Sequence, residues 1–300
     1  MELRDIEYFA AIAERGHVGR TADALGISQS ALSKCLRRLE RSTGTKLVQR
    51  TPKGIELTAV GSALLSHVRR LRLAHEDIAR ELADLSQGHA GHLRVACNPG
   101  FTEAVVGMAC ATRLNEASKV TFKVTIIDTF AASLRSGEFD LAVSGSPATP
   151  SEDLIHEHLI DDVFVVYASV NHRLIRRNRL ILADLVQERW ASSEASVSWQ
   201  GLRRAFEEQG LPSPRLAVSS NAMSVRYRAV AGSDLLGFTA KAHLRQAAPQ
   251  FPLVELPVKK LSWGRRFGVS YRKGAYLSPA AKRFIEILKA TAKEIAAEKP

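Results

Sequence analysis

The sequence lacks any run of apolar residues long enough to cross a membrane. A spanning helix needs about 20 consecutive apolar residues, whereas the longest apolar run near the middle of this 300-residue chain is Val163–Tyr167. The first residues, Met1–Asp5, also lack the basic-then-apolar pattern of an export signal. We therefore expect a cytoplasmic protein that has no membrane partner.

Cysteine is scarce, and the common catalytic motifs are missing. The three cysteines are Cys35, Cys97 and Cys110, and no two of them form a CxxC pair, which argues against a disulfide framework and a structural zinc site. The chain also contains no GxSxG elbow, Walker loop, GxGxxG turn or HExxH helix. These absences speak against an enzyme, and we expect neither a cofactor nor a bound metal.

Positive charge, in contrast, is in excess. The net charge is +11 and the isoelectric point is about 9.8, which favours an anionic partner, with nucleic acid first. Residues 1–58 contribute a net charge of +3, from ten basic and seven acidic side chains, and residues 59–90 contribute none. Residues 91–300 carry the remaining +8. Charge alone therefore does not locate a DNA-binding segment.

Hydrophobic spacing predicts three helices at the N-terminus. Leu3–Arg15 repeats apolar residues every three or four positions. Arg20–Leu25 is a second, short helix, and Gly26-Ile27 forms the turn after it. Ser28 then caps a third helix that runs to about Ser42. Two helices joined by a tight turn in this way are typical of a helix-turn-helix.

The third helix has one apolar face and one polar to basic face. Leu32, Leu36 and Leu39 recur at positions i, i+4 and i+7, which directs them toward a core. A helix that enters the major groove by its N-terminus presents its first side chains to base edges, where glutamine pairs with adenine and serine with several bases. Basic side chains farther along the helix contact phosphates. The residues that we assign to DNA from this helix are Gln29, Ser30, Ser33, Lys34 and Arg37, with Arg38 as a further phosphate ligand.

Two short strand patterns around a Pro-Lys-Gly turn follow, over residues 47–58. They predict a wing, with Arg50 and Lys53 beside the DNA backbone or the minor groove. An isolated basic helix is more often only a solvated surface helix. The helix-turn-helix spacing together with the wing favours DNA binding instead.

The same segment resembles the DNA-binding domain of LysR-type transcriptional regulators. The matching stretches are residues 9–16 (FAAIAERG), 25–33 (LGISQSALS) and 44–50 (GTKLVQR). Ser30 stands where the family often has proline. The resemblance implies a winged helix-turn-helix over residues 1–58 that reads double-stranded DNA. The contacts that it implies are Gln29, Ser30, Ser33, Lys34, Arg50 and Lys53.

A long helix is predicted from Ala59 to about Ser86, within a linker over residues 59–88. Its apolar residues alternate at spacings of four and three, as in a coiled-coil seam. The seam comprises Leu64, Val68, Leu71, Ile78, Leu82 and Leu85, with His75 as a polar interruption. It needs a partner, which is either the same helix of a second copy or the chain's own domain. LysR-type regulators dimerise through a similar helix, and the resemblance implies a homodimer that assembles into a homotetramer.

Residues 91–300 alternate strand and helix patterns, which predicts an α/β domain with buried parallel sheets. Strand patterns at 163–168 and 266–271 can cross between two lobes. We expect lobe I to comprise residues 91–162 and 267–300, and lobe II to comprise residues 163–266. The stretches 134–143 (LRSGEFDLAV), 182–185 (LADL) and 229–237 (AVAGSDLLG) resemble the family's effector-binding domain, which is similar to periplasmic binding proteins.

The loops at the carboxyl ends of these strands are rich in hydroxyl and small side chains. Ligands of open α/β sheets bind at this edge, and hydroxyls with helix N-terminal amides suit a carboxylate or another anion. Each hydroxyl alone is equally well explained by a turn or a helix cap. Glu194 would favour an effector with an amine, unless it points to solvent, as most glutamates do. The effector residues that we expect are Asn98, Gly100, Phe101, Thr102, Thr129, Ser144, Ser193, Asn221 and Thr239.

Three functions compete for this sequence. A transcription regulator that binds DNA and responds to a small molecule explains both the N-terminal domain and the large α/β region, and RNA polymerase is then a further expected partner. An enzyme lacks its motifs, and an architectural DNA-binding protein does not need roughly 200 residues of two-lobed sheet. Two variants of regulation stay open. One has no small-molecule effector, and the other senses oxidants through Cys97, which is otherwise a small buried residue.

Overall fold

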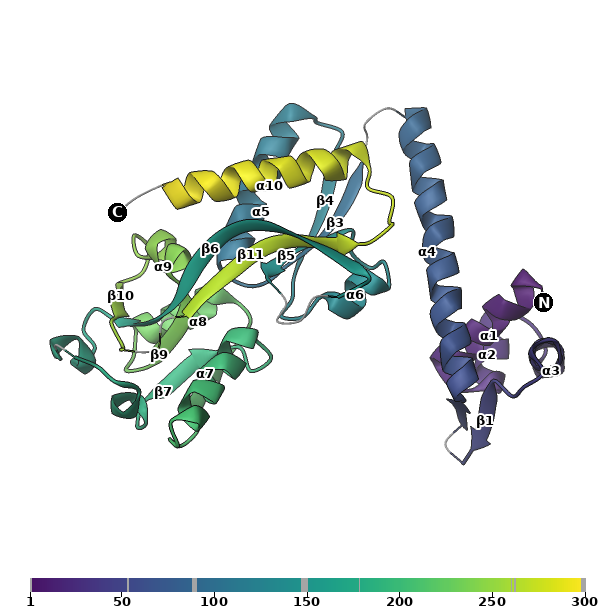
Figure 1. Cartoon of the computed structure of the whole chain (residues 1–300), viewed down its shortest axis with the longest axis horizontal. Helices are drawn as coiled ribbons and strands as arrows, with labels where there is room; N and C mark the ends of the chain where they lie inside the picture. The colour runs from purple at the N-terminus through teal and green to yellow at the C-terminus, as the bar shows by residue number, and fades with distance from the viewer. Residues whose placement is uncertain are drawn as a thin grey trace. The chain divides into compact units, whose positions relative to one another are not determined.

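The computed structural model describes residues 2–52, 54–87, 91–146, 151–177, 179–259, 261 and 263–297. The chain forms two units, Met1–Ala79 and Arg80–Pro300 (Figure 1). Lys53 of the predicted wing and residue 88 at the end of the predicted linker lie outside the described residues. Among the helices described, none has the length and apolar character that a membrane span requires.

The N-terminal unit is built on three helices and a two-stranded wing. The helices are α1 (Leu3–Arg15), α2 (Val18–Leu25) and α3 (Gln29–Thr43), and each is followed by a glycine with a positive φ angle. The wing pairs β1 (Val48–Thr51) with β2 (Gly54–Leu57) in antiparallel register. Phe9, Ile12, Leu32 and Leu39 are fully buried in one shared core, and each such side chain contributes about 1.5–3 kcal/mol through burial. This core fixes the angle between α3 and the other helices.

Helix α4 (Ala59–Gln87) divides the predicted seam into two parts. Its first turns belong to the N-terminal core, because Val68 is buried there and Leu64 packs against it. Arg72 reinforces this packing with a 2.7 Å hydrogen bond to Glu7 of α1. After Val68 the remaining apolar seam residues are exposed. The exposed fractions are 47% for Leu71, 57% for Ile78, 61% for Leu82 and 77% for Leu85. The first part of the seam therefore serves the chain's own domain, and the second part is open.

The C-terminal unit contains one mixed sheet, which confirms the predicted α/β class. Its nine described strands are β3 (His92–Cys97), β4 (Thr121–Ile126), β5 (Leu141–Gly145), β6 (Leu154–Ser169), β7 (Arg189–Ser192), β8 (Arg215–Ser219), β9 (Leu236–Ala240), β10 (Leu253–Leu256) and β11 (Trp263–Arg272). The order is β4-β3-β5-β11-β6-β9-β7-β8, and β10 pairs with β6. Pairs at both ends of the sheet are parallel, whereas β6 and β11 pair antiparallel with each other and with their neighbours.

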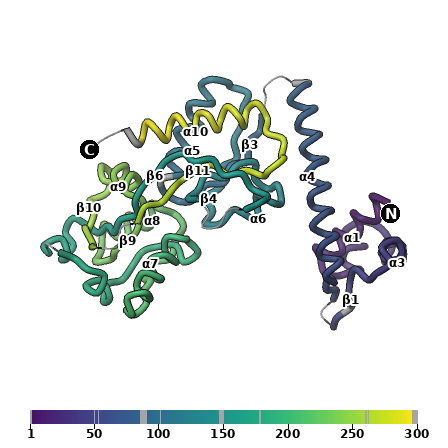
Figure 2. The backbone as a smooth tube through the Cα atoms, viewed as in Figure 1, coloured from purple at the N-terminus to yellow at the C-terminus, as the bar shows by residue number. Residues whose placement is uncertain are grey.

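The long strands β6 and β11 connect two lobes. They lie side by side from the β5 end of the sheet to the β9 end (Figure 2). One lobe packs β3, β4 and β5 against α5 (Phe101–Glu116) and α10 (Pro279–Ala297), with Phe284 at the centre of the core. The other packs β7, β8 and β9 with α7 (Val197–Glu208) and α8 (Met223–Ala231), around a fully buried Trp190. Two crossing strands are the arrangement that the sequence predicts for a two-lobed domain.

Candidate DNA interface and effector cavity

The N-terminal turn of α3 is presented to solvent. Ser28 caps the helix by accepting a hydrogen bond from the Ala31 amide at 3.2 Å, and its hydroxyl also lies 3.0 Å from that of Ser30. Of the residues assigned to DNA, Gln29, Ser30, Lys34 and Arg37 are exposed, and Ser33 is half-buried. The polar face of α3 is thus available along its length, as a recognition helix requires.

A surface recess joins this turn to the wing. Gln29 lines it together with Arg20 of α2, Thr51 and Gly54. The wing is held in place by the Ile55 amide, which donates a 2.8 Å hydrogen bond to the Gly16 carbonyl. A side chain at Gly54 would come within 2.5 Å of that carbonyl oxygen, and the φ angle of +130° also favours glycine. The exposed Arg20, which the sequence reasoning missed, therefore lies beside the predicted contact Gln29.

Two further arginines assigned to DNA, Arg50 and Arg38, have other surroundings. Arg50 lies in β1, paired with Ile55. Arg38 does not face solvent freely, because its Nε donates a 2.6 Å hydrogen bond to Asp5 and its terminal nitrogen donates to the other carboxylate oxygen. These bonds hold the pKa of the buried Asp5 below its usual value. Arg38 thus fastens α3 to α1, and its assignment as a phosphate ligand stays a prediction.

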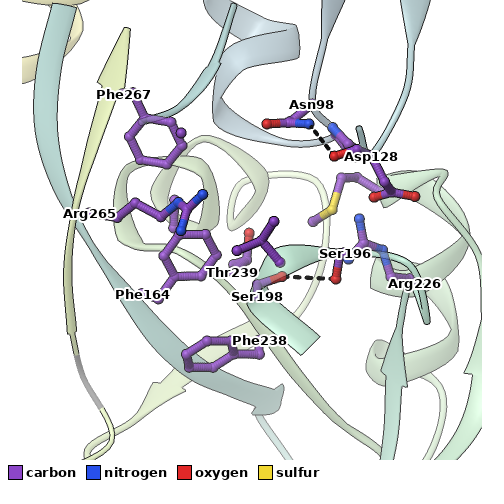
Figure 3. Close-up of a pocket in the computed structure, with 15 residues that line it drawn as sticks. Asn98, Asp128, Phe164, Ser196, Ser198, Arg226, Phe238, Thr239, Arg265 and Phe267 are labelled. Atoms are coloured by element: carbon purple, nitrogen blue, oxygen red, sulfur yellow. Dashed lines mark hydrogen bonds between the residues drawn. The ribbon is translucent and has the colours of Figure 1, made fainter. Parts of the chain in front are cut away.

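The C-terminal unit contains a cavity of about 60 Å³ where the two lobes and the crossing strands meet (Figure 3). Its wall combines polar and aromatic side chains. The lining residues are Asn98, Pro99, Asp128, Gly145, Phe164, Ser196, Val197, Ser198, Met223, Arg226, Phe238, Thr239, Ala240, Arg265 and Phe267. The N-terminal turn of α7 is among them, and helix N-termini attract anions.

Two arginines give this cavity its character. Arg226 of α8 is only 4% exposed, and its Nε has no hydrogen-bond partner. Arg265 of β11 packs over Gly145, where an added Cβ would lie 2.2 Å from its Nε, and burial lowers the pKa of Arg265. Neither guanidinium forms an ion pair within the described residues. Arg226 is a buried cation and Arg265 a half-buried one. Burial of a cation without a counter-ion is costly, so the cavity is suited to receive an anion.

Asp128 provides the one carboxylate among the lining residues. Its Oδ2 accepts a 2.7 Å hydrogen bond from Ser193, which joins the loop after β4 to the loop after β7, and its Oδ1 is buried without a partner. The Asn98 amide donates to the Ile127 and Asp128 carbonyls at 2.9 and 3.0 Å. These bonds fix the carboxylate at the cavity and connect the two lobes there.

The structure brings only part of the predicted effector set together. Asn98 and Thr239 line the cavity, and Ser193 holds one of its lining residues. Thr102 instead donates a 2.6 Å hydrogen bond to the Asn98 carbonyl, Ser144 bonds the neighbouring Gly145 carbonyl, and Gly100 has a φ angle of +99° beside His243. Thr129, Asn221 and Glu194 are exposed. Phe101 begins α5, and its side chain is outside what the structure describes.

The arginines were missed although the sequence holds a signal for each. Arg226 shares the i, i+3, i+4, i+7 face of α8 with Met223, Tyr227 and Val230, all of them buried. Arg265 lies between Trp263 and Phe267 at every second position of β11, so the three share one face of the strand. A cation at an apolar position of a helix or strand is expensive unless it serves a ligand or an ion pair. The signal was a charged residue at a position where the repeat of a helix or strand expects an apolar residue.

The Cys97 thiol lacks the environment of a redox sensor. Cys97 is 1% exposed at the end of β3, and burial raises the pKa of its thiol to about 12. Reactive cysteines are partly exposed and have lowered pKa values. Among the described residues, no group of three His, Cys, Asp or Glu side chains gathers as a metal site.

The end of α4 is joined to the first lobe at the start of β5. Asp140, directly before β5, accepts hydrogen bonds from Arg80 of α4 and, at 2.7 Å, from Arg94 of β3. Burial would raise the pKa of Asp140, but these bonds hold it below its usual value. Asp84 of α4 accepts a 3.2 Å hydrogen bond from Tyr276. Since β5 ends at Gly145 in the cavity wall, one short strand connects the linker to the cavity.

Comparisons with known proteins agree with this architecture. Residues 3–62 match the bacterial regulatory helix-turn-helix protein of the lysR family, and residues 86–293 match the LysR substrate binding domain. The HTH-type transcriptional regulator GbpR of Azospirillum brasilense is 26% identical over 295 residues, which cover 97% of this chain and 86% of that protein.

Solved structures share the fold of the whole chain. ArgP from Mycobacterium tuberculosis is similar with a TM-score of 0.66 at 18% identity, covering 96% of both chains. Full-length CbnR in complex with its target DNA gives a TM-score of 0.61 at 20% identity, covering 97% of this chain and 100% of that one. The chain therefore belongs to the LysR family of DNA-binding transcriptional regulators, with a helix-turn-helix domain followed by a substrate-binding domain for an effector.

Proposed function

We propose that this chain regulates transcription in response to a small anion that binds between its two lobes. The observation that carries the proposal is the cavity that is lined by the buried Arg226 and the half-buried Arg265, with no ion-pair partner for either among the described residues. An anion there would satisfy both guanidinium groups, and the N-terminal turn of α7 would add its dipole. The chain would act as a cytoplasmic binding protein and not as an enzyme.

DNA would be read by the exposed face of α3 and by the wing. Gln29, Ser30 and Ser33 would reach base edges in the major groove, while Lys34 and Arg37 would neutralise phosphates. Arg50 and Lys53 keep their proposed place beside the backbone or minor groove. Arg20 joins this set because it lines the same recess as Gln29.

The second half of the linker seam would pair with a second copy of the chain. The exposed Leu71, Ile78, Leu82 and Leu85 follow one another at spacings of seven, four and three, which is the spacing of a coiled-coil seam. A homodimer would place two recognition helices on the half-sites of a pseudo-palindrome. Assembly of two dimers into a tetramer, and contact with RNA polymerase, extend the proposal.

Effector binding would reach the DNA-binding domain through β5. An anion on Arg265 would displace the guanidinium that packs over Gly145, at one end of the strand. Asp140, just before the other end, holds Arg80 of the linker helix. Five strand residues span roughly 16 Å and are buried throughout, so the strand would move as a unit. The effector must favour one of two linker positions for the coupling to operate.

Two alternatives are weaker on physical grounds. A regulator without a small-molecule effector leaves the buried Arg226 and the half-buried Arg265 without an explanation. A redox regulator that uses Cys97 would need a thiolate, and burial of this thiol disfavours that form.

A footprint on the DNA upstream of the protein's own gene tests the proposal. We expect wild type to protect a discrete pseudo-palindrome, and Gln29→Ala to keep only weak, salt-sensitive binding without sequence preference. The small-molecule fraction of cytosol should change the wild-type footprint but not that of Arg265→Met, and the fraction should lose this effect after anions are removed. A Gln29→Ala footprint like wild type would disprove the recognition assignment. A response that survives anion removal would disprove the anionic effector.

A further inference from the structure

The carboxylate of Asp128 is a second recognition point in the cavity, besides the two arginines. Its Oδ1 is buried and accepts no hydrogen bond, although Oδ2 takes one from Ser193. A buried acceptor without a donor is destabilising, and such an atom in a binding site calls for a donor on the ligand. In Figure 3, Asp128 and Arg226 lie on one side of the cavity and Arg265 on the other.

The charges in the wall limit the charge of the ligand. Among the lining residues, Arg226 and Arg265 contribute two positive charges and Asp128 one negative charge, which leaves a net charge of +1. A monoanion neutralises this set. A dianion would place surplus negative charge close to a carboxylate in a region of low dielectric constant, where like charges repel strongly.

The size of the cavity limits the length of the ligand. Its volume is about 60 Å³, far below the ~300 Å³ at which sites for drug-sized molecules begin. Phe164, Phe238 and Phe267 close the wall with rings that stack on one another, with 5.3 and 6.2 Å between the ring centroids of Phe164 and its two neighbours. The site therefore holds a short chain with one apolar side.

We propose that the effector is a short monocarboxylate that carries a hydroxyl group as a hydrogen-bond donor. This assignment rests on the proposed function and names the chemical class of its effector. The carboxylate lies on the guanidinium groups, for which planar, bidentate pairing is favourable. The donor group binds Oδ1 of Asp128. The carboxylate of Asp128 thus selects against plain fatty acids and against dicarboxylates.

Four three-carbon carboxylates of closely similar size separate these features. Propionate has no donor, L-lactate has a hydroxyl, L-alanine has an ammonium group and malonate has a second carboxylate. Affinities are measured by calorimetry on the full chain. We expect L-lactate to bind at least about tenfold more tightly than propionate, as one charge-assisted hydrogen bond allows. L-alanine, which has no net charge, and malonate, which has two negative charges, should both bind more weakly than L-lactate.

Substitutions of Asp128 and Arg265 test which residue is responsible for each ligand preference. Asp128→Asn should bring the preference over propionate close to unity and should strengthen malonate binding, a gain that a merely structural role would not produce. Arg265→Met should weaken all four ligands by about tenfold or more, whereas Arg266→Met, an exposed neighbour on the same strand, should leave them unchanged. If Asp128→Asn does not fold, Ser193→Ala keeps the carboxylate and frees its second oxygen, so the preference for a donor must persist.

Any of three results would overturn the proposal. The first is equal binding of propionate and L-lactate to the wild-type protein, and the second is tightest binding of malonate or L-alanine. The third is absence of binding by all four at millimolar concentration. The footprint with cytosolic anions remains independent, because it detects an anionic effector of any class. A response there without binding here would contradict this assignment and leave the proposed function intact.

Discussion

Removal of Arg38 should destabilise the N-terminal unit more than removal of its partner Asp5. The two side chains form a bidentate pair between α3 and α1, with Nε–Oδ2 at 2.6 Å. The Arg38 side chain is 43% exposed and that of Asp5 is 1% exposed. Arg38→Met therefore strands a buried carboxylate, whereas Asp5→Asn leaves a guanidinium that water can reach.

The expected magnitudes follow from this difference in exposure. Breaking a buried pair by removing one partner costs about 3–5 kcal/mol, because the other charge is left without compensation. We expect Arg38→Met to approach that range. Asp5→Asn should cost about 1.5–3 kcal/mol, the contribution of hydrogen bonds to a charged group. The double variant should be more stable than Arg38→Met alone, since it removes the stranded charge.

Hydrogen-exchange mass spectrometry on peptides from α1 and α3 measures these free energies in the full chain. DNA binding provides the functional control. Arg38→Met should leave the slope of log affinity against log salt unchanged, whereas Lys34→Met, on the exposed face of the same helix, should reduce it by about one. Equal costs for the two single variants would contradict the argument from burial. A reduced salt slope in a folded Arg38→Met protein would confirm Arg38 as a phosphate ligand.

Three further predictions concern the linker, a thiol and a histidine. Ile78→Asp should weaken self-association by about tenfold or more in sedimentation experiments. Val68→Asp should instead unfold the N-terminal unit, because Val68 lies in its core. The same outcome for both variants would disprove the division of the seam into a packed part and an exposed part. The Cys97 thiol should resist iodoacetamide at about pH 8, since burial raises its pKa to about 12, and fast labelling by mass spectrometry would show otherwise. Burial lowers the pKa of His243 to about 4. As pH falls from about 6.5 toward 4, this histidine is protonated in the unfolded chain first, so the second lobe should lose stability across that range. The melting temperature of His243→Gln should depend less on pH than that of wild type, and an equal dependence would exclude this histidine as the cause.

Long periodic segments could be read from the sequence, and short ones could not. The predicted bounds of α1 (Leu3–Arg15) agree with the structure, because its apolar face repeats over several turns. The helix α9 (Lys241–Ala247) and the strand β10 were not predicted. Each is stabilised by packing on β6 and not by its own pattern.

The crossing strand β6 shows why strand ends are hard to predict. The apolar run indicates only residues 163–168, whereas the strand extends over Leu154–Ser169. Its first half, LIHEHLID over residues 154–161, does not alternate apolar and polar side chains. It is a strand because it pairs with β11, more than a hundred residues away in sequence, and such a distant partner leaves no local pattern.

The sequence predicted the edge of the sheet at which the cavity lies, but it did not predict most of the residues that line the cavity. Asn98 and Thr239 lie in loops and strand ends that the switch-point rule identifies. Which side chain of such a loop faces the cavity depends on the closure of one lobe on the other. Thr102 and Ser144 satisfy neighbouring carbonyls instead. The two arginines of the wall belong to the helix α8 and the strand β11, whereas the rule considers only loops and strand ends.

The connection between the cavity and the linker can be tested by removing the linker's contact alone. Arg80→Met frees α4 from Asp140, while Arg94 continues to neutralise that carboxylate at 2.7 Å, so the lobe should stay folded. We expect effector affinity and DNA affinity to stay within about twofold of wild type, and the change in footprint on effector addition to shrink from the 5–150-fold range of typical allosteric coupling toward none. Arg70→Met, an exposed arginine on the same helix, is the matched control and should respond as wild type does. A full effector response in Arg80→Met would show that the coupling does not pass through β5 and Asp140.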